Sequence, residues 1–435
     1  MSALGIVTAS AMANGEKGLG GVVLAHPSGN QFFRHLAAAL RDVGGLADVC
    51  TCIDWRGGWP GWLLPRNTAA ELARRSFSRE LRVPVATHAW REAARLGAGR
   101  MGMAGLVRHE TGFFSVDAVY RDFDRWVARR LPDIRGAGTV YAYEDAALAT
   151  FRAAKALGWQ RAYDLPILHW RTSRRLLDEE VARWPEWEPT LIGTRDSAAK
   201  HARKDEELAL ATHVVCPSRF VADSLPAQIR AERRVVIAPF GSPAPAAEQD
   251  RARPAGGPLR VLFAGAMTQR KGLADLFAAM RLLRRSDVEL VVLGSPVVDM
   301  SFYRGAFAGF AHEAPRPHAA VLALMRTCDV FCLPSVVEGR ALVVQEAMSQ
   351  GLPVVVTANT GTEDVVEDGR NGFVVPIRSP AVLAEKISWF ADRRAAIPDM
   401  GDEARRSASR FTWDVYAGLV LDALGKTISR REHDS

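Results

Sequence analysis

Two glutamates, Glu338 and Glu346, stand eight positions apart where the composition of the chain changes from strand to loop to helix. Residues 330–333 are an apolar run typical of a buried strand, and residues 341–350 have the Ala, Leu, Gln, Glu and Met content of a helix. Glu338 then lies in the loop, where its carboxylate can accept hydrogen bonds from hydroxyl groups. Glu346 lies about two turns on, at ~3.6 residues per turn, on the face where the helix begins.

The start of that helix predicts an anion site. The backbone amides of Arg340, Ala341, Leu342 and Val343 begin the helix and face any anion placed there, such as a diphosphate. The carboxylate of Glu346 can accept from both hydroxyls of a ribose, and each bond to a charged acceptor contributes roughly 1.5–3 kcal/mol. For an isolated pair of glutamates, a helix cap and a solvated side chain would be the preferred interpretation. The surrounding sequence favours a sugar-nucleotide site instead.

A second loop, Gly265–Gly272 (GAMTQRKG), has the form of a phosphate site. It follows an apolar run at 259–264 and precedes an amphipathic helix that begins at residue 273. A glycine-bearing loop that leads into a helix N-terminus binds phosphate by geometry, and Arg270 and Lys271 add positive charge where a diphosphate would lie. The alternative is a surface loop with an incidental Arg-Lys pair.

The elements that must position these loops alternate between strand-like and helical runs, which predicts two doubly wound α/β domains with a cleft between them. Residues 242–258 are rich in Pro, Ala and Gly and are typical of a linker. The predicted division is a flexible tail at 1–20, a Rossmann-like domain at 21–241, the linker at 242–258, a second Rossmann-like domain at 259–410, and a helix and tail at 411–435.

The order of the motifs resembles that of the group 1, or family 4, retaining glycosyltransferases of the GT-B architecture. Their signature is E-x7-E in a strand–loop–helix unit, then a G-x-P-V-V strand and a Glu-bearing turn that ends in D-G-x-x-G. After Glu338 and Glu346, this chain supplies 351–355 (GLPVV), 363–366 (EDVV) and 368–374 (DGRNGFV). It departs from the family after Glu-Gly, where Arg340 replaces an aromatic or apolar residue.

The resemblance implies an enzyme that moves a sugar from a nucleotide-diphosphate sugar to a glycan, lipid-linked or other hydroxyl acceptor, with retention and without a metal or other cofactor. It implies that Lys271 neutralises the leaving diphosphate and that Arg270 replaces an arginine common in the family after the first glycine, Gly265. Glu338 would position the sugar and Glu346 would hold the ribose. The second domain would bind the donor, and the C-terminal helix would return to the first, acceptor-side domain. Synthesis of bacterial-type surface polysaccharides or glycoconjugates is the implied setting.

The acceptor side has fewer signals. Residues 26–30 (HPSGN) end the first predicted strand. The resemblance implies that this loop, with His26, Gly29 and Asn30, approaches donor and acceptor across the cleft. A strand-end histidine without a role is the alternative at His26. Family members often carry a histidine after a later strand of this domain, and Asp164 and His169 are the residues of this chain nearest to that position. They are predicted to contact the sugar or the acceptor.

Composition excludes several classes of protein. With 48% hydrophobic and 24% charged residues, the 435-residue chain is a folded protein long enough for two domains. No apolar run approaches the ~20 residues that span a bilayer. The five cysteines lack the His or Cys partners of a zinc site and predict reduced core residues of a cytoplasmic protein.

The basic charge of the chain is partly local. The net charge is +7, but no nucleic-acid-binding motif accompanies it, so no nucleic-acid partner is expected. Nine arginines occur between Arg66 and Arg108, just after Trp55, Trp59 and Trp62. Aromatics beside arginines in the region 55–108 suit an anionic membrane at its inner face, or an acidic or lipid-linked acceptor. The alternative is a solvated basic helix with its tryptophans in the core.

Two other classes of function fit the same motifs: another GT-B enzyme, such as a sugar-nucleotide epimerase, and a non-catalytic subunit that binds a sugar nucleotide. The triplet Asp122-Phe123-Asp124 has the D-x-D form that the other large glycosyltransferase fold uses to hold a metal. It falls in a helical pattern, which predicts solvated helix charges instead.

Overall fold

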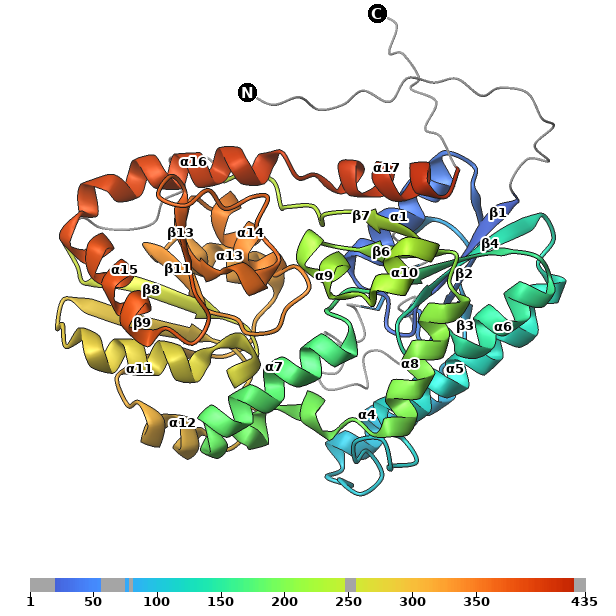
Figure 1. Ribbon diagram of the computed structural model, residues 1–435, viewed down its shortest axis with the longest axis horizontal. Helices are drawn as coiled ribbons and strands as arrows, with labels where there is room; N and C mark the ends of the chain where they lie inside the picture. Colours follow the sequence, from blue (N-terminus) through green and yellow to red (C-terminus); the bar gives the residue numbers. More distant parts are fainter. Residues whose placement is uncertain (1–19, 56–74, 78–80, 247–255, 426–435) are drawn as a thin grey trace, which may run out of the picture.

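The computed structural model describes residues 20–55, 75–77, 81–246 and 256–425 of the protein. These residues form two α/β domains, each built around a parallel sheet with helices on its faces (Figure 1). The predicted class, two doubly wound domains with a C-terminal helix that returns to the first, is confirmed. Trp59, Trp62 and residues 56–74 of the predicted basic region lie outside the described residues.

The first sheet has seven strands in the order β3-β2-β1-β4-β5-β6-β7, all parallel. This order reverses between β1 and β4, and ligands of such sheets bind at the carboxyl ends of the strands on either side of the reversal. The strands are β1 (Gly21–Ala25), β2 (Leu46–Thr51), β3 (Ala86–Thr87), β4 (Ala137–Tyr143), β5 (Gln160–Asp164), β6 (His213–Cys216) and β7 (Arg234–Ile237).

The central strands of this sheet are buried on both faces, because helices cover each face and successive side chains point to opposite sides. On β1, Val22 and Leu24 enter the core that contains α1, whereas Val23 and Ala25 enter the core that contains α5 and α6. The helices of this domain are α1 (Gln31–Asp42), α4 (Trp90–Arg100), α5 (Val116–Arg130), α6 (Leu148–Ala156), α7 (Trp170–Arg183), α8 (Ala198–Leu210), α9 (Arg219–Ser224) and α10 (Ala227–Glu232).

The second sheet has six parallel strands in the order β10-β9-β8-β11-β12-β13, so its order reverses between β8 and β11. Its strands are β8 (Leu259–Ala264), β9 (Val288–Leu293), β10 (Phe310–Glu313), β11 (Val330–Leu333), β12 (Val354–Thr357) and β13 (Gly372–Val375). The helices around it are α11 (Leu273–Leu283), α12 (Met300–Ala306), α13 (His318–Met325), α14 (Leu342–Ser349), α15 (Pro380–Asp392) and α16 (Ile397–Ser409).

Two helical segments cross between the domains. Helix α17 (Trp413–Ala423) continues from α16 along both domains (Figure 1) and buries Tyr416, Val420 and Leu421 in the core beside α1. In the other direction, α7 leads into a short 3-10 helix, Pro185–Thr190, that packs on the second domain. Its Trp187 is 2% exposed and lies in the second domain's core, with its ring centroid 5.9 Å from that of Phe277.

The Asp122-Phe123-Asp124 triplet lies on α5 as predicted, but the prediction that its charges are solvated is wrong. Asp124 is buried and accepts hydrogen bonds from the amides of Ala149 (2.7 Å) and Thr150 (2.9 Å), so it caps the first turn of α6. Asp122 lies 2.9 Å from the ring of His88. Asp124 is therefore structural, because α6 needs the amides of its first turn satisfied, and Asp122 is paired with His88.

The five cysteines are buried and free, as the sequence predicts. Within the described part of the chain, no helix is both long and apolar enough to cross a membrane.

Candidate active site

The two predicted donor loops meet where the strand order of the second sheet reverses. Strand β8 leads into Gly265–Gly272, and its neighbour β11 leads into the loop before α14. The amides of Val336 and Val337 donate to the carbonyl of Arg270 at 2.9 and 3.2 Å, which joins the loops. Gly272 has φ +74°, and a Cβ on it would fall 2.0 Å from the carbonyl oxygen of Pro334. The close approach of the loops therefore requires glycine at this position.

Glu338 shares one carboxylate oxygen between two cations. Lys271 Nζ and Arg270 Nη1 both contact its Oε1, the latter at 3.1 Å. Burial by itself would raise the pKa of Glu338, but Arg270 and Lys271 outweigh it and hold the pKa below its ordinary value. Burial lowers the pKa of the Lys271 ammonium, and Glu338 opposes that change. Two cations and one anion leave this cluster with an excess of one positive charge.

Lys271 and Glu338 line a cavity of about 520 Å³ between the domains, together with Gly265 and the residues 340–343 that begin α14. The structure therefore gathers most of the predicted donor residues around one space. The amides of Leu342 and Val343 have no acceptor among the described residues, as an anion site requires. The prediction of a free amide is wrong at Ala341, which donates to the carbonyl of Thr360 at 2.9 Å.

The cavity also has walls that the sequence analysis missed. Ser295 follows β9, Pro315 and Arg316 follow β10, and Phe32 and Phe240 come from the first domain. Because Ser295, Pro315 and Arg316 come just after strands of a parallel sheet, their position in the sequence was a usable signal. Phe32 and Phe240 stack with their ring centroids 4.6 Å apart, and nothing in the sequence links them to the donor loops.

Glu346 does not line this cavity, and it is not solvated either. Its side chain is 15% exposed and lies 3.0 Å from Nε2 of His318, at the start of α13. This hydrogen bond raises the pKa of His318. Val321, on the same helix, does line the cavity, so α13 connects Glu346 with the cavity wall.

The side chain of Arg340 is fully buried and holds the surrounding turns together. Its Nε donates to Gln345 at 2.6 Å, its Nη1 donates to Asp364 at 2.7 Å, and its guanidinium lies 4.8 Å from the ring centroid of Phe411. Arg340 therefore ties α14 to the Glu363-Asp364 turn and to the segment that leads into α17. This is a structural reason for an arginine where the family carries an apolar residue.

None of the predicted acceptor-side residues lines this cavity. The ring of His26 is buried, and its Nδ1 accepts from the amides of Ser28 (3.2 Å) and Gly29 (2.9 Å). Burial lowers the pKa of His26 to about 3, so the ring is neutral. Asn30 caps α1 by accepting from the amide of Phe33 at 3.0 Å. These residues shape the loop after β1.

Asp164 and His169 are also held away from this cavity. Asp164 ends β5, and burial raises its pKa to about 8. His169 caps α7 by accepting from the amide of Arg171 at 3.4 Å, and its Nε2 lies 3.3 Å from Asp205. Burial lowers the pKa of His169 to about 4. At neutral pH, Asp164 is mostly protonated and His169 is neutral.

A second cavity, of about 320 Å³, lies beside the Arg270–Lys271–Glu338 cluster and was not predicted. Ala266 borders both cavities, and Arg270 lines this one. The first domain contributes Trp170 and His201, whose rings stack with centroids 4.0 Å apart. Other charged residues on its walls are Arg174, Asp196 and Lys204, and Arg174 and Lys204 pair with Asp178 and Glu144. The cavity combines an aromatic surface with cations.

The domains touch at Gly339, directly after Glu338. Ser218 Oγ donates to the carbonyl of Gly339 at 2.7 Å, and the amide of Phe220 donates to Glu363 at 3.1 Å. A Cβ at residue 339 would fall 1.7 Å from the carbonyl oxygen of Pro166. The loop after β5 of the first domain therefore packs directly against the Glu338 loop.

Among the described residues, one group of side chains, His109, Glu110 and Asp196, has donor atoms close enough to share a metal ion. Each has a partner within the protein: His109 lies 2.9 Å from Asp196, Glu110 accepts from the amide of Ser197, and Asp196 accepts from Lys200. This group is accounted for as an ion-pair network.

Residues 246–407, most of the second domain, match the family of group 1 glycosyl transferases. Residues 246–407 are therefore a group 1 glycosyl transferase domain. A D-inositol 3-phosphate glycosyltransferase of Paenarthrobacter aurescens (strain TC1) is 31% identical over 180 residues, which are 39% of this chain and 44% of the relative. The match thus spans less than half the length of that curated relative.

The likeness to solved structures extends over both domains. Sucrose-phosphate synthase from Thermosynechococcus elongatus has a TM-score of 0.68 at 16% identity, over 94% of this chain and 98% of its own. HepE from Anabaena, solved in complex with UDP and glucose, has a TM-score of 0.62 at 14% identity, over 93% of this chain and 99% of its own. The chain therefore has the GT-B fold over both of its domains.

Proposed function

We propose that this protein transfers a sugar from a nucleotide-diphosphate sugar to a hydroxyl acceptor, with retention of the anomeric configuration and without a metal. The observation that carries the proposal is the buried cluster of Arg270, Lys271 and Glu338 beside the unbonded amides of Leu342 and Val343. A diphosphate gains negative charge as it leaves the sugar. Positive charge and backbone amides fixed around this cavity stabilise that charge in the transition state.

In the proposed step, the acceptor oxygen bonds to the anomeric carbon while the bond from that carbon to the diphosphate oxygen breaks. The hydroxyl proton then needs a base. His26 and His169 do not line the donor cavity, so we assign the proton to the departing diphosphate oxygen, on the face of the sugar where the new bond forms. Both cations contact Oε1 of Glu338, and we assign its Oε2 to a hydroxyl of the transferred sugar.

A cavity of about 520 Å³ is in the range of ligand sites, roughly 300–1,000 Å³. Because HepE was solved with UDP and glucose, UDP-sugars are the first donors to test. Glu346 would accept hydrogen bonds from the ribose hydroxyls once its hydrogen bond with His318 is broken.

We assign the acceptor to the second cavity, which shares Ala266 with the donor cavity. Stacked Trp170 and His201 suit the face of a sugar or polyol, and Arg174 and Lys204 suit a phosphate. The name of the Paenarthrobacter relative specifies an inositol phosphate, which supports a phosphate-bearing acceptor. A glycan or lipid-linked acceptor of surface polysaccharide synthesis, at the inner face of a membrane, fits this chemistry.

The test begins with thermal-shift measurements of the whole protein against UDP-, GDP-, ADP- and dTDP-sugars. A ligand at about a hundredfold excess over Kd stabilises by roughly 2.7 kcal/mol. Release of nucleoside diphosphate, with and without sugar phosphates as acceptors, then separates transfer from binding. Binding without turnover for every acceptor would support a non-catalytic subunit, and a changed sugar on an intact nucleotide would support an epimerase.

A further inference from the structure

The exposed apolar side chains of the described chain are concentrated at one end of the first domain. Six of the thirteen exposed large hydrophobic residues fall within residues 90–116, here called the 90–116 surface. They are Trp90 (49% exposed), Met101 (65%), Met103 (45%), Leu106 (39%), Phe113 (58%) and Val116 (48%). Single exposed hydrophobic residues are ordinary, but a contiguous group marks a binding surface.

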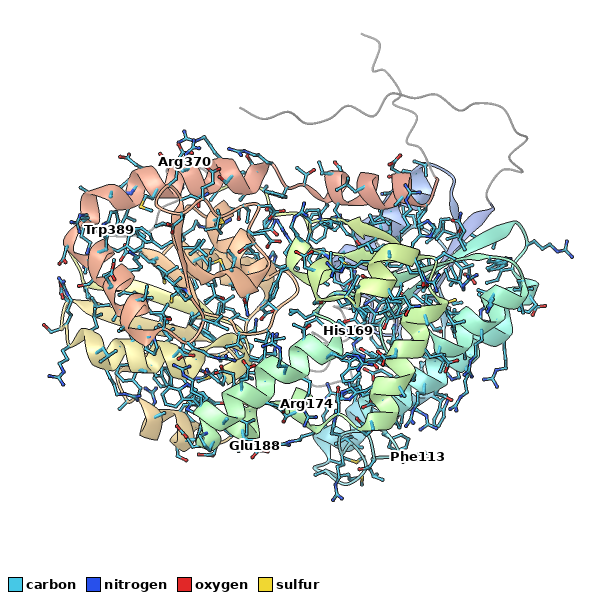
Figure 2. The ribbon with its side chains drawn as sticks, viewed as in Figure 1. Phe113, His169, Arg174, Glu188, Arg370 and Trp389 are labelled. Atoms are coloured by element: carbon cyan, nitrogen blue, oxygen red, sulfur yellow. The ribbon has the colours of Figure 1, made fainter. Side chains whose placement is uncertain are left out.

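Five of the six side chains lie on α4 and the loop that follows it, and Val116 begins α5. Residues 101–106 (MGMAGL) are exposed at every position and include no charged side chain. Gly102 and Gly105 have no other atom within 4 Å of the place of a Cβ, so the rest of the described chain leaves this loop uncovered. The ring of Phe114 contacts both Phe113 and Trp90, with centroids at 5.0 and 6.4 Å. Figure 2 shows Phe113 at the lower edge of the first domain.

Positive charge surrounds this surface. Arg91 lies over the rings of Trp90 and Phe113, 4.6 Å from each centroid. Arg100 and Arg108 are exposed on either side of the MGMAGL loop. The two acidic residues of the segment are engaged within the protein: Glu92 is buried between Arg75 and Arg95, and Glu110 accepts from the amide of Ser197.

We propose that the 90–116 surface binds an anionic lipid bilayer, with the MGMAGL loop and Phe113 inserted among the acyl chains and Arg100 and Arg108 at the phosphates. Flexible Met and Leu side chains beside amphipathic aromatics and arginines combine the two contributions that interfacial binding needs, apolar burial and attraction to anionic headgroups. From the sequence, membrane contact of residues 55–108 was one of two open interpretations, beside a solvated basic helix. The proposal places it on α4 and the loop that follows. It does not depend on the catalytic assignment, because it concerns a different surface.

The experiment is flotation of the whole protein with phosphatidylcholine vesicles, with and without phosphatidylglycerol. The parent should float with the anionic vesicles only, and less at high salt. Met101→Ser/Met103→Ser/Phe113→Ser should lower binding at least tenfold with an unchanged melting curve, because these side chains are exposed. Arg100→Gln/Arg108→Gln should remove the preference for phosphatidylglycerol. The matched control, Leu282→Ser, changes a residue 58% exposed on α11 and should float like the parent.

Three results would overturn the proposal. The parent would fail to float with any vesicle, or the triple variant would float like the parent. The third is that the parent does not float and is a dimer in light scattering, whereas the triple variant is a monomer. That result would assign the surface to contact between copies of the chain.

Discussion

Lys271 and Glu338, 67 residues apart in the sequence, form a buried ion pair at the carboxyl ends of two neighbouring strands, and Arg270 shares the same carboxylate oxygen. The pair joins the two loops that we propose bind the donor. Its energetics link folding with function, because a buried charge without its partner is costly.

Removing either member of the pair should impair both stability and turnover. Lys271→Met should lower kcat by about 10²–10³-fold, the usual cost of losing one group that stabilises a leaving anion. Glu338→Gln should cost roughly 3 kcal/mol of unfolding free energy, since it leaves two cations together. The double variant Lys271→Met/Glu338→Gln should regain stability without regaining turnover. Chemical denaturation and nucleotide release measure these effects, and a fully active double variant would refute the assigned site.

Donor binding should strengthen as pH rises through the titration of His318. Its pKa is raised by the hydrogen bond to Glu346, so in the free protein this pair contributes stability below pH ~6.5 that is lost as pH rises through the raised pKa. If the ribose hydroxyls bond to Glu346 in place of His318, the pKa of His318 falls back to its ordinary value and the ring releases protons. Binding that releases protons is stronger at higher pH. Kd values for the donor, measured by calorimetry at about pH 6 and about pH 8, on either side of the ordinary histidine pKa of ~6.5, should differ several-fold. His318→Gln should abolish the difference, and an unchanged pH slope in that variant would exclude the exchange.

Gly339→Ala should keep the domains apart. The new Cβ would lie 1.7 Å from the carbonyl oxygen of Pro166, so the contact with the Glu338 loop cannot form. Turnover should fall at least tenfold while donor affinity changes only a few-fold, because most donor contacts lie within the second domain. Small-angle scattering should show a larger radius of gyration. Gly305→Ala, at a glycine with open space around it, is the control. Parental turnover in Gly339→Ala would show that this contact is dispensable.

Asp164→Asn should flatten the dependence of stability on pH. Burial raises the pKa of Asp164 to about 8, so between its unfolded pKa of ~3.9 and that value the folded state binds more protons than the unfolded state. Stability then falls as pH rises across this window. Calorimetric melting at about pH 5 and about pH 8, within this window, should be compared for the two proteins. The loss of stability between the two pH values should be smaller for Asp164→Asn than for the parent. Asp223→Asn, on the surface of α9, should behave like the parent.

The sequence predicted the parts of the fold and site that depend on local pattern. Periodicity located β8, β11 and α14 to within a residue or two, and turn residues located the loops that carry Lys271 and Glu338. Because adjacent parallel strands end at the same edge, the loops had to be close. The sequence could not show that Arg340 would be buried against Asp364 and Phe411, since those partners come from distant segments. For the same reason, the predictions that Asp124 is solvated and that the amide of Ala341 is free were wrong.

By itself, the sequence determined the class of fold, the two donor loops and the family of the second domain, because these follow from short-range spacing of apolar residues, glycines and charges. Only the tertiary structure decided which side chains meet. It placed Phe32 and Phe240 of the first domain on the donor cavity, held His26 and His169 away from it, and put Trp187 in the core of the other domain. It also left the 90–116 surface uncovered. Burial and contact depend on how distant segments pack, which no local pattern contains.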